Sequence, residues 1–359
     1  MSARPEILVI HPIENDPQSV ILYEEILSRG GRPRMLPFLM KDGAGPAAIS
    51  ASKDHIAFGD DLSSVRAVFV RGLSVDVPLF APPYISEAEY AAWRARYIRE
   101  NQRIYIINQL LAMLESRGAL IVNPISTYLH HNTKAQLAEL FRRRSLPLPP
   151  TFATNDSARL DRAINSQKKY VMKSAAGVGA TRITDERHLG KSRELRMSPA
   201  LFQRRVEGDT VRVHTVGDKA VLSLRIFATD VDSRSDTAGF EVIRLTDAQE
   251  RAIIEANRAI GIRFSAWDVI IDRRGRVQLL DCNIGPYIYW IGPYFTRLFK
   301  AEVARYLIRY SETGSTAEAD AAVRRAEPMI DRIYKISDEA MPHIRNLTEL
   351  WKKSLRVRF

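Results

Sequence analysis

The feature that most constrains the fold is a pair of apolar runs separated by a short polar segment, within residues 264–290. The runs are 267–271 and 277–280, and Gly275 lies in the segment between them. Glycine adopts positive φ without steric cost, so this pattern predicts a β-hairpin that turns near Arg274. A surface hairpin whose acidic residues only keep it soluble also fits the spacing.

The predicted hairpin brings three oxygen-bearing side chains together. With the turn near Arg274, Asp268 lies almost opposite Asp281 on the partner strand. Asp281 and Asn283 share one face of their strand while Cys282 points away, because side chains alternate along a strand. Two carboxylates and an amide suit Mg²⁺, with positions left for phosphate oxygens. We therefore expect a Mg²⁺ site that presents the ion to a nucleotide.

Length and cysteine content limit the class of protein. The chain has 359 residues, 45% of them hydrophobic, so two or three domains are expected. One cysteine excludes an intramolecular disulfide and indicates a reducing compartment. We see neither a signal peptide nor the roughly 18 consecutive apolar residues of a membrane span. The expectation is a cytoplasmic protein with no membrane partner.

The net charge of +11 favours an anionic partner. Nucleic acid, an anionic membrane surface and an acidic substrate would all gain from a positive field, and composition alone does not choose among them. The basic residues are spread through every segment, and no basic stripe is interleaved with aromatic residues as in a nucleic-acid channel. A non-catalytic nucleic-acid-binding protein is therefore kept only as a remote alternative.

Residues 1–125 have the pattern of an open α/β domain with parallel strands. Its strands are expected at 7–11, 35–38, 66–71 and 119–122 and its first helix at 18–28. Ser86, with acidic residues close behind, marks the start of a long helix over 86–117. The nearly continuous apolar part of that helix, 104–114, is expected to be buried, and residues 41–64 are expected to be a loop.

The second part of the chain begins with a helix over 134–144, which the following prolines end. A short strand then reaches Lys173 and leads into a loop of small residues that includes Gly177 and Gly179. Such a loop lets backbone N–H groups approach phosphate oxygens, although a plain tight turn has the same pattern. Strands are expected at 200–206 and 210–224 and helices at 250–260, 296–310 and 317–350.

Taken in order, these features resemble the ATP-grasp ligases. The similarity is to their peptide-modifying branch, which includes glutamate-adding ligases and the maturases of graspetides such as microviridins. The similarity covers roughly residues 65–310. No single motif is specific to the family, but the order in which the motifs follow one another is. The motifs are Asn123-Pro124, Asn132 to Lys134 with Gln136-Leu137, 148–156, Lys173 before the Gly loop, Asp209 to Arg212 before Gly217, Asp232 to Arg234, Asp268 with Asp281 to Asn283, and Trp290.

The resemblance implies an α/β architecture that becomes α+β in the C-terminal part. Residues 1–125 would form the N-terminal α/β (pre-ATP-grasp) domain. Residues 126–205 and 206–312 would form the central and C-terminal ATP-grasp subdomains, which clasp ATP between them, with the metal site in the second. Residues 313–359 would form a helical extension.

The resemblance also implies an activity. Ligases of this kind use ATP to convert a carboxylate into an acyl phosphate, which an amine or hydroxyl then attacks, and they release ADP. The expected substrate is an acidic, ribosomally made peptide with a leader segment, closed by side-chain ester or amide bonds. Joining free amino acids or small carboxylates, or adding an amino acid to a protein, is the alternative. ATP, two Mg²⁺ ions with Mn²⁺ as a substitute, and a homodimer are expected.

The family's functional residues carry over by motif. Lys134 and Lys173 would contact the nucleotide phosphates, and Arg212, with Lys173, would act on the transferred phosphoryl group. Other nucleotide-binding residues would be Gly177, Gly179, Gln203, Arg205, Val206, Glu207 and Asp209. Asp268, Asp281 and Asn283 would bind the metal, and Arg234, Asp232, Arg71 and Trp290 would contact the substrate.

Structural interpretations stay open for several of these residues. Lys134 could be a solvated helix lysine, and Arg212 could pair with Asp230 or Asp232. Arg234 could pair with Asp236, and Trp290 and Tyr287 could be packing residues. The adjacent residues His130 and His131 point in different directions, which disfavours a shared metal.

Two departures from the family pattern lie beside the metal residues. The family usually has Glu where this chain has Asp281, a shorter side chain that can weaken a metal contact. It usually has Gly where this chain has Pro286, with Gly285 just before it. The first 65 residues and the tail after about residue 311 match no known pattern.

Overall fold

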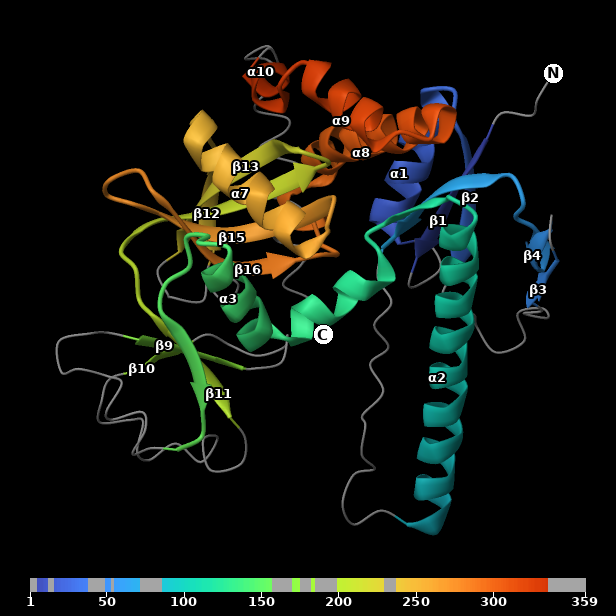
Figure 1. Ribbon diagram of the computed structural model, residues 1–359, viewed down its shortest axis with the longest axis horizontal. Helices are drawn as coiled ribbons and strands as arrows, with labels where there is room; N and C mark the ends of the chain where they lie inside the picture. The colour runs from blue at the N-terminus through green and yellow to red at the C-terminus, as the bar shows by residue number, and fades with distance from the viewer. Residues whose placement is uncertain are drawn as a thin grey trace. The chain divides into compact units, whose positions relative to one another are not determined.

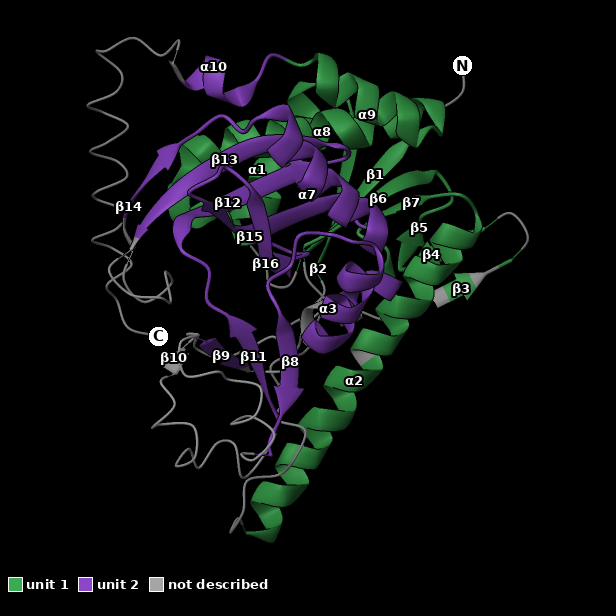
Figure 2. Cartoon of the chain, turned by 60° about the vertical axis from the view of Figure 1, so that its left-hand side comes forward, with its two compact units in different colours: residues 1–125, 287–326, 338–359 green, residues 126–286, 327–337 purple. Residues whose placement is uncertain are grey.

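The computed structural model describes residues 5–11, 16–37, 49–52, 55–71, 86–156, 170–174, 182–184, 199–228 and 237–334. The chain divides into two compact units, coloured separately in Figure 2. Unit 1 comprises residues 1–125, 287–326 and 338–359, and unit 2 comprises residues 126–286 and 327–337. None of the helices that the structure describes is both long and apolar enough to span a bilayer.

Unit 1 contains a four-stranded parallel sheet in the order β2-β1-β6-β7. Its strands are β1 (Glu6–His11), β2 (Arg32–Pro37), β6 (Val65–Val70) and β7 (Leu120–Val122). Every residue of β1 is buried, as expected for a parallel strand covered on both faces. Helices α1 (Pro17–Ser28) and α8 (Pro293–Thr313) pack together beside it, and α9 (Thr316–Arg325) packs on α8. The predicted open α/β domain is confirmed.

The long helix α2 (Glu87–Ser116) begins where the sequence predicts. Ser86 caps it through a capping box, in which the Ser86 hydroxyl accepts from the Glu89 N–H and the Glu89 carboxylate accepts from the Ser86 N–H. Its second half is buried on one face only: Leu110 and Leu111 are inaccessible, whereas Tyr105 is 61% exposed. The buried face packs on β7, and in Figure 1 the first half of α2 extends away from the sheet of its own unit.

The expected loop over 41–64 is wrong in part. The described residues form a small antiparallel sheet of β3 (Ile49–Ala51), β4 (Ile56–Phe58) and β5 (Asp60–Asp61). Ile56, Phe58 and Leu62 are buried, so apolar burial outweighs the turn-forming Gly, Asp and Ser residues of this segment.

The helical stretch expected over 317–350 begins as two helices with a break between them. Helix α9 ends at Arg325, and a separate helix α10 (Met329–Tyr334) follows Pro328. The interruption follows from proline, which disfavours helical conformation in the residue before it, here Glu327. Residues 335–350 of the predicted helix lie outside the described residues.

Unit 2 contains two antiparallel sheets. The smaller has the order β10-β9-β11-β8, with β8 (Thr151–Thr154), β9 (Tyr170–Ser174), β10 (Arg182–Thr184) and β11 (Ala200–Arg204). The larger has the order β14-β13-β12-β15-β16, with β12 (Gly208–Val216), β13 (Lys219–Ala228), β14 (Thr237–Val242), β15 (Phe264–Asp272) and β16 (Val277–Asn283). The 3-10 helix η1 (Ile125–Asn132) leads into α3 (Lys134–Arg143), and α7 (Asp247–Ile260) also packs on the larger sheet.

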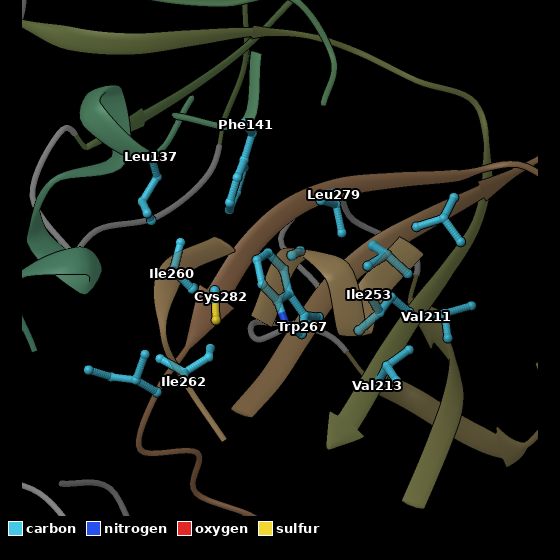
Figure 3. Packing of buried hydrophobic residues seen from close by; sticks show 14 residues of the cluster. Leu137, Phe141, Val211, Val213, Ile253, Ile260, Ile262, Trp267, Leu279 and Cys282 are labelled. Carbon is cyan, nitrogen blue, oxygen red and sulfur yellow. The ribbon is translucent and has the colours of Figure 1, made fainter. Parts of the chain in front are cut away.

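The predicted hairpin is the β15–β16 pair, and one of its faces forms the core of unit 2. Trp267 is completely buried and contacts Phe141 of α3, with ring centroids 5.7 Å apart (Figure 3). Cys282 lies in the same cluster as Trp267. Gly275 takes a φ of 76° in the turn, as predicted. Because one face of the hairpin is buried in the core, the alternative of a purely surface hairpin is ruled out.

A β-bulge at Leu280 sets which side chains of β16 face the core. Val269 pairs with Leu279, yet the next pair is Asp268 with Asp281, so Leu280 is an additional residue. The bulge places Cys282 beside Trp267 in the core and leaves Asp281 and Asn283 on the opposite face. Bulges of this kind re-aim side chains next to functional sites.

Gly208 starts β12 at a position where only glycine fits. Its φ is 156°, and a Cβ atom there would lie 2.2 Å from the carbonyl oxygen of Ile271 on β15. Gly208→Ala should lower the free energy of unfolding by about 1–3 kcal/mol, because backbone must move to admit the methyl group. Gly239→Ala on β14, where nothing lies within 4 Å, is the matched control and should be near neutral in urea denaturation.

Candidate active site

Four charged side chains of unit 2 form a continuous row. Both guanidinium nitrogens of Arg212 that face Asp268 donate to its carboxylate, Nε to Oδ1 at 2.8 Å and Nη2 to Oδ2 at 3.0 Å. Lys134 Nζ donates to Asp281 Oδ2 at 2.6 Å. Asp268 and Asp281 are direct partners across the hairpin, so the row alternates as cation, carboxylate, carboxylate, cation. Two adjacent carboxylates repel each other, and the flanking cations offset that repulsion.

The fold explains why these four residues meet. Arg212 pairs with Asp268 in the β12–β15 register, and Asp268 pairs with Asp281 in the β15–β16 register, so three neighbouring strands contribute one residue each. Lys134 is the first residue of α3, whose Leu137 is buried in the core one turn later. The helix is therefore fixed by its apolar side while its first residue reaches Asp281.

Asn283, the third predicted metal ligand, is exposed on the same face as Asp281. Its Oδ1 accepts a hydrogen bond from the backbone N–H of Gly285 at 3.0 Å, which orients the amide. In the part of the chain that the structure describes, no three His, Cys, Asp or Glu side chains are grouped closely enough to hold a metal ion. The amide of Asn283 is therefore needed to complete an oxygen set of three, and this set fits Mg²⁺.

Cys282 is excluded as a ligand by its direction and its protonation. Burial raises the pKa of the Cys282 thiol well above its usual value, and the carboxylates of Asp281 and Asp268 raise it further. Metal ligation and nucleophilic attack both require the thiolate. Cys282 is thus a neutral core residue, as its buried position in β16 indicates.

An apolar pocket lies beside the row. Its volume is about 320 Å³ including the part open to solvent, and α3, β8, β11 and β16 form its walls. Gln203, only 1% exposed, lines it together with Lys134 and Asp281. The other residues that line the pocket are Leu137, Ala138, Phe141, Leu148, Thr151, Leu201, Leu280 and Cys282, and all except Thr151 are apolar. The enclosed space between these side chains is only about 20 Å³, so a planar ligand would enter only if the lining side chains move apart.

A chain of hydrogen bonds fixes the polar wall of this pocket. Lys173 Nζ donates to Gln203 Oε1 at 3.1 Å, and Gln203 Nε2 donates to Thr151 Oγ1 at 3.2 Å. Lys173 and Gln203 lie on the neighbouring strands β9 and β11. The structure thus brings together four predicted residues: Lys134, Lys173, Gln203 and Asp281.

Other predicted nucleotide residues lie on the segment between β11 and β12. Glu207 pairs with Arg273 at 3.2 Å and Asp209 with Arg225 at 3.2 Å, and Arg225 is partly buried while the other three are largely exposed. The adjacent residues of this segment are Arg205 and Val206. The residues that line the pocket include none of the predicted positions from 205 to 209. Gly177, Gly179, Asp232 and Arg234 lie outside the described residues, as do Asp230, Asp236 and the side chains of His130 and His131.

Arg71 and Trp290 lie in unit 1. Arg71 follows the last residue of β6, and its guanidinium carbon is 5.7 Å from the ring centroid of Tyr287. Trp290 is partly buried in a short 3-10 helix, η2 (Tyr289–Ile291). These two residues, which the sequence assigns to the substrate, therefore belong to a different unit from the four residues of the row.

The sequence did not predict the ion pairs of the row. Arg212 pairs with Asp268, and the partners that the sequence suggested, Asp230 and Asp232, lie outside the described residues. The pairing depends on β12 lying next to β15, a long-range neighbour relation that has no local signal. The apolar walls of the pocket were missed for the same reason, because α3, β8 and β11 are distant in sequence from β16.

Comparison with known proteins identifies the domain. Residues 131–262 match the family described as the ATP-grasp domain. A curated relative, the "Probable alpha-L-glutamate ligase" of Xanthomonas axonopodis pv. citri (strain 306), is 25% identical over 193 residues, 49% of this chain and 64% of the relative. The chain thus matches less than two thirds of the length of that relative.

Solved structures give the same fold. The ATP-grasp ligase PsnB, complexed with minimal precursor, Mg and ADP, is 22% identical, with a TM-score of 0.70 over 85% of this chain and 97% of that chain. The macrocyclase MdnC from Microcystis aeruginosa MRC, bound with precursor peptide MdnA, is 18% identical, with a TM-score of 0.65 over 84% and 98%. A RiPP-associated ATP-grasp ligase of Chryseobacterium gregarium, in complex with ADP and a leader and core peptide, is 16% identical, with a TM-score of 0.61 over 90% and 98%.

The class of protein follows from these findings. The chain has the ATP-grasp fold with mixed α/β content, as the sequence predicted. Residues 131–262, which match the ATP-grasp domain family, contain the pocket wall from α3 to β11 and the Arg212 end of the charged row.

Proposed function

We propose that this chain is an ADP-forming, ATP-dependent ligase that joins a carboxylate to an amine or a hydroxyl on a peptide. The observation that carries the proposal is the alternating row from Arg212 to Lys134 beside an apolar pocket, within an ATP-grasp domain. Such a row holds two cations and two carboxylates ready for a polyphosphate and its metal. The PsnB and MdnC structures, which contain precursor peptides, support the peptide as substrate.

The pocket is our candidate for the adenine site. Its leucine and phenylalanine walls suit a planar base, and the buried Gln203 can hydrogen-bond to a polar edge. Lys134 lines the pocket, and Lys173 donates to Gln203 on its wall. Both lysines would reach the phosphates, together with the loop of Gly177 and Gly179. We place the backbone of Arg205 and Val206 at the adenine edge and Glu207 or Asp209 at the ribose, between the central (126–205) and C-terminal (206–312) subdomains.

Asp268, Asp281 and Asn283 would hold Mg²⁺, and we expect two ions, with Mn²⁺ able to replace them. When bound, the metal neutralises charge on the phosphates and on the transferred phosphoryl group. Lys134 and Arg212 would then exchange their carboxylate partners for phosphate oxygens. The exchange keeps every charge paired, so neither cation has to be desolvated alone.

The reaction has two steps that balance. A substrate carboxylate oxygen attacks the γ-phosphorus of ATP, the bond to the β–γ bridging oxygen breaks, and ADP leaves. The amine or hydroxyl then attacks the acyl carbon, phosphate leaves with the bonding electrons, and the nucleophile loses a proton. Arg212, with a rigid fork of donors, would stabilise the charge on the transferred group in both steps.

The substrate we propose is an acidic peptide with a leader segment. A net charge of +11 both attracts such a peptide and compensates its charge once bound. Arg234, next to Asp232, would hold a core carboxylate near the phosphoryl group, and Arg71 and Trp290 would contact the peptide from unit 1. These four roles rest on the resemblance.

A second reading, in which the chain adds an amino acid to a protein or peptide, is favoured by the similarity to the Xanthomonas glutamate ligase. Mass spectrometry separates the two on any short acidic peptide that is encoded next to this chain's gene. Ring closure removes one water for each bond formed, whereas amino-acid addition raises the mass by one residue. An unchanged peptide, with ATP turnover on free amino acids alone, would contradict both and leave a small-molecule ligase.

Lys173→Ala should raise KM for ATP roughly tenfold with little change in kcat, because a charged phosphate contact is lost in the ground and transition states alike. Lys219→Ala, at the start of β13 in the same unit, is the control and should leave KM unchanged. Unaltered nucleotide affinity of Lys173→Ala in calorimetry would make Lys173 a support for Gln203 only.

We also propose a homodimer formed through α2. The rings of Tyr90, Trp93 and Tyr97 follow one another along this helix, with centroid distances of 5.7 and 5.3 Å, and Ile98 beside them is 44% exposed. An aromatic stripe on an exposed helix is a typical self-association surface.

Light scattering should therefore give the mass of two chains. Trp93→Glu should give the mass of one, whereas Ala95→Glu, which adds the same charge on another face of α2, should not. A wild-type monomer at micromolar concentration would contradict the proposal.

A further inference from the structure

Several polar side chains of unit 1 gather at the carboxyl end of its parallel sheet. The chain runs from β1 to β2 on one side and later adds β6 on the other side of β1, so the strand order reverses between β1 and β6. In open parallel sheets, ligands bind outside the carboxyl ends of the strands at such a reversal. Here β1 ends at His11, β6 ends at Val70, and α1 begins with its N-cap Asp16.

Arg71 is fixed at this point by its backbone and by a ring. Its N–H donates to the carbonyl of Ile10 at 2.8 Å, which holds the residue against the end of β1. Its guanidinium faces the ring of Tyr287 at 5.7 Å, and its Nε is 3.8 Å from Asp16 Oδ2, beyond hydrogen-bond distance. That Asp16 oxygen already accepts from the backbone and hydroxyl of Ser19, at 2.9 and 2.6 Å.

Lys300 brings a second cation to the same place from α8. The residue is fully buried, and its Nζ lies 4.6 Å from the ring centroid of Phe69 on β6. Burial first, and then the positive charge of Arg71, lower the pKa of Lys300 to about 7, with Asp16 opposing the shift. Arg71 and Asp16 are thus close enough to Lys300 to act on its charge.

Gln18, in the first turn of α1, supplies an unsatisfied donor. The residue is fully buried, and its Oε1 accepts a hydrogen bond from the backbone N–H of Ile288 at 2.8 Å. This bond shows which end of the side-chain amide is the oxygen and which is the nitrogen. Its Nε2 is buried with no hydrogen-bond partner among the described residues. A buried donor without an acceptor is costly in a native protein and indicates a ligand or water that is held there.

We propose that Arg71, Lys300 and Gln18 form a binding site for a carboxylate at the carboxyl end of the unit 1 sheet, with the Tyr287 ring as its wall. The site supplies a guanidinium fork, an ammonium and an amide N–H₂, all donors. The N-terminus of α1 adds a partial positive charge at the same end of the sheet. All members belong to unit 1, whereas the row of Arg212 to Lys134 belongs to unit 2.

The charges favour a carboxylate over a phosphate. Arg71 contributes one positive charge, Asp16 one negative charge, and Lys300 up to one positive charge. The sum lies between zero and one positive charge, which matches a single negative charge. A phosphate dianion would leave a buried excess of negative charge.

The test uses the full chain without ATP or metal, so that it does not depend on ligase activity. The two probes are N-acetyl-glutamate amide and N-acetyl-glutamine amide, whose blocked ends carry no charge. They differ only in the side chain, which ends in a carboxylate in the first and in an amide in the second. In ligand-observed NMR titrations the glutamate probe should bind roughly tenfold more tightly, because only the carboxylate accepts charge-assisted hydrogen bonds. Inorganic phosphate is titrated as a third probe.

Lys300→Met, which keeps the length and apolar stem of the side chain, should weaken binding of the glutamate probe roughly tenfold, and Arg71→Lys should weaken it through loss of the fork. The control is Arg66→Gln, which removes an exposed cation from β6, the strand that ends just before Arg71. This variant should bind the probe as the wild type does. So should Arg212→Ala, which removes a cation from unit 2. Circular dichroism checks that each variant is folded.

Equal affinity for the two probes, no binding of either, or tighter binding of phosphate than of the glutamate probe would overturn the proposal. Wild-type affinity in both Lys300→Met and Arg71→Lys would also overturn it and leave Lys300 as a packing residue on Phe69. Loss of binding in Arg212→Ala alone would assign the carboxylate to the row in unit 2. None of these outcomes depends on whether the chain turns over ATP.

Discussion

Asp268→Asn should lower Mg²⁺-dependent ATP turnover by roughly 10²–10³-fold or more while the protein stays folded. The substitution keeps the shape of the side chain and removes its charge, so the oxygen set loses one of two carboxylates and Arg212 loses its partner. Asp268 is 38% exposed and its pair with Arg212 lies at the protein surface, so the free energy of unfolding should change by less than about 1 kcal/mol. ADP release under saturating Mg²⁺ is the measurement.

Asp272→Asn on the same strand is the matched control. The Asp272 carboxylate accepts from the N–H groups of Arg274 and Arg276 in the hairpin turn, and these bonds, that of Arg276 first, lower its pKa. A carboxyl group with a lowered pKa adds stability that is lost as pH falls through that pKa. Asp272→Asn should therefore weaken the fold at neutral pH and leave turnover per folded molecule intact.

Asp281 provides the contrast within the row. Asp281→Asn should be as severe as Asp268→Asn, whereas Asp281→Glu should be tolerated or bind the metal more tightly, because the resembled ligases usually carry Glu here. Full turnover in both Asp268→Asn and Asp281→Asn would remove the hairpin from the metal site and leave the two carboxylates as ion-pair partners of Arg212 and Lys134.

Arg212→Ala should lower kcat roughly 10²–10³-fold and change KM for ATP much less. Its fork now holds Asp268 bidentately at 2.8 and 3.0 Å, and such a fork is worth most where charge develops during phosphoryl transfer. Arg212→Lys keeps the charge but not the fork and should fall between the wild type and the alanine variant. Single-turnover kinetics separates the chemical step from binding.

Arg258→Ala is the control for charge alone. Arg258 is an exposed cation of α7 in the same unit, paired with Asp218 at 3.7 Å. Its loss should leave kcat unaltered. A parallel loss of folded protein and activity in Arg212→Ala, with kcat per folded molecule retained, would show that the Arg212–Asp268 pair only holds β12 against β15.

The local pattern of residues 264–290 was enough to predict the hairpin, its turn and the placement of Asp268 near Asp281. These follow from strand alternation and from the freedom of Gly275, both of which are local. The bulge at Leu280 was not predictable, because an additional residue is accommodated only to bring Cys282 beside Trp267 in the core. Without it, Leu280 would stand opposite Asp268.

Long-range neighbours account for most of what the sequence did not show. The pairing of Lys134 with Asp281 joins residues that are 147 positions apart, and the pairing of Arg212 with Asp268 spans 56. Such contacts depend on strand order and helix placement, which no short motif records. The cluster around Lys300 was missed because a lysine inside a helix is normally solvated, and only packing of α8 on α1 and β6 buries it.

The acyl phosphate is the central claim, and one isotope experiment tests it most directly. A peptide that the protein modifies is prepared with the heavy isotope of oxygen in its side-chain carboxylates and incubated with the protein, ATP and Mg²⁺. The proposed mechanism predicts one labelled oxygen in inorganic phosphate for each bond formed, together with an equal amount of ADP. Release of AMP and pyrophosphate, or phosphate without label, would contradict it.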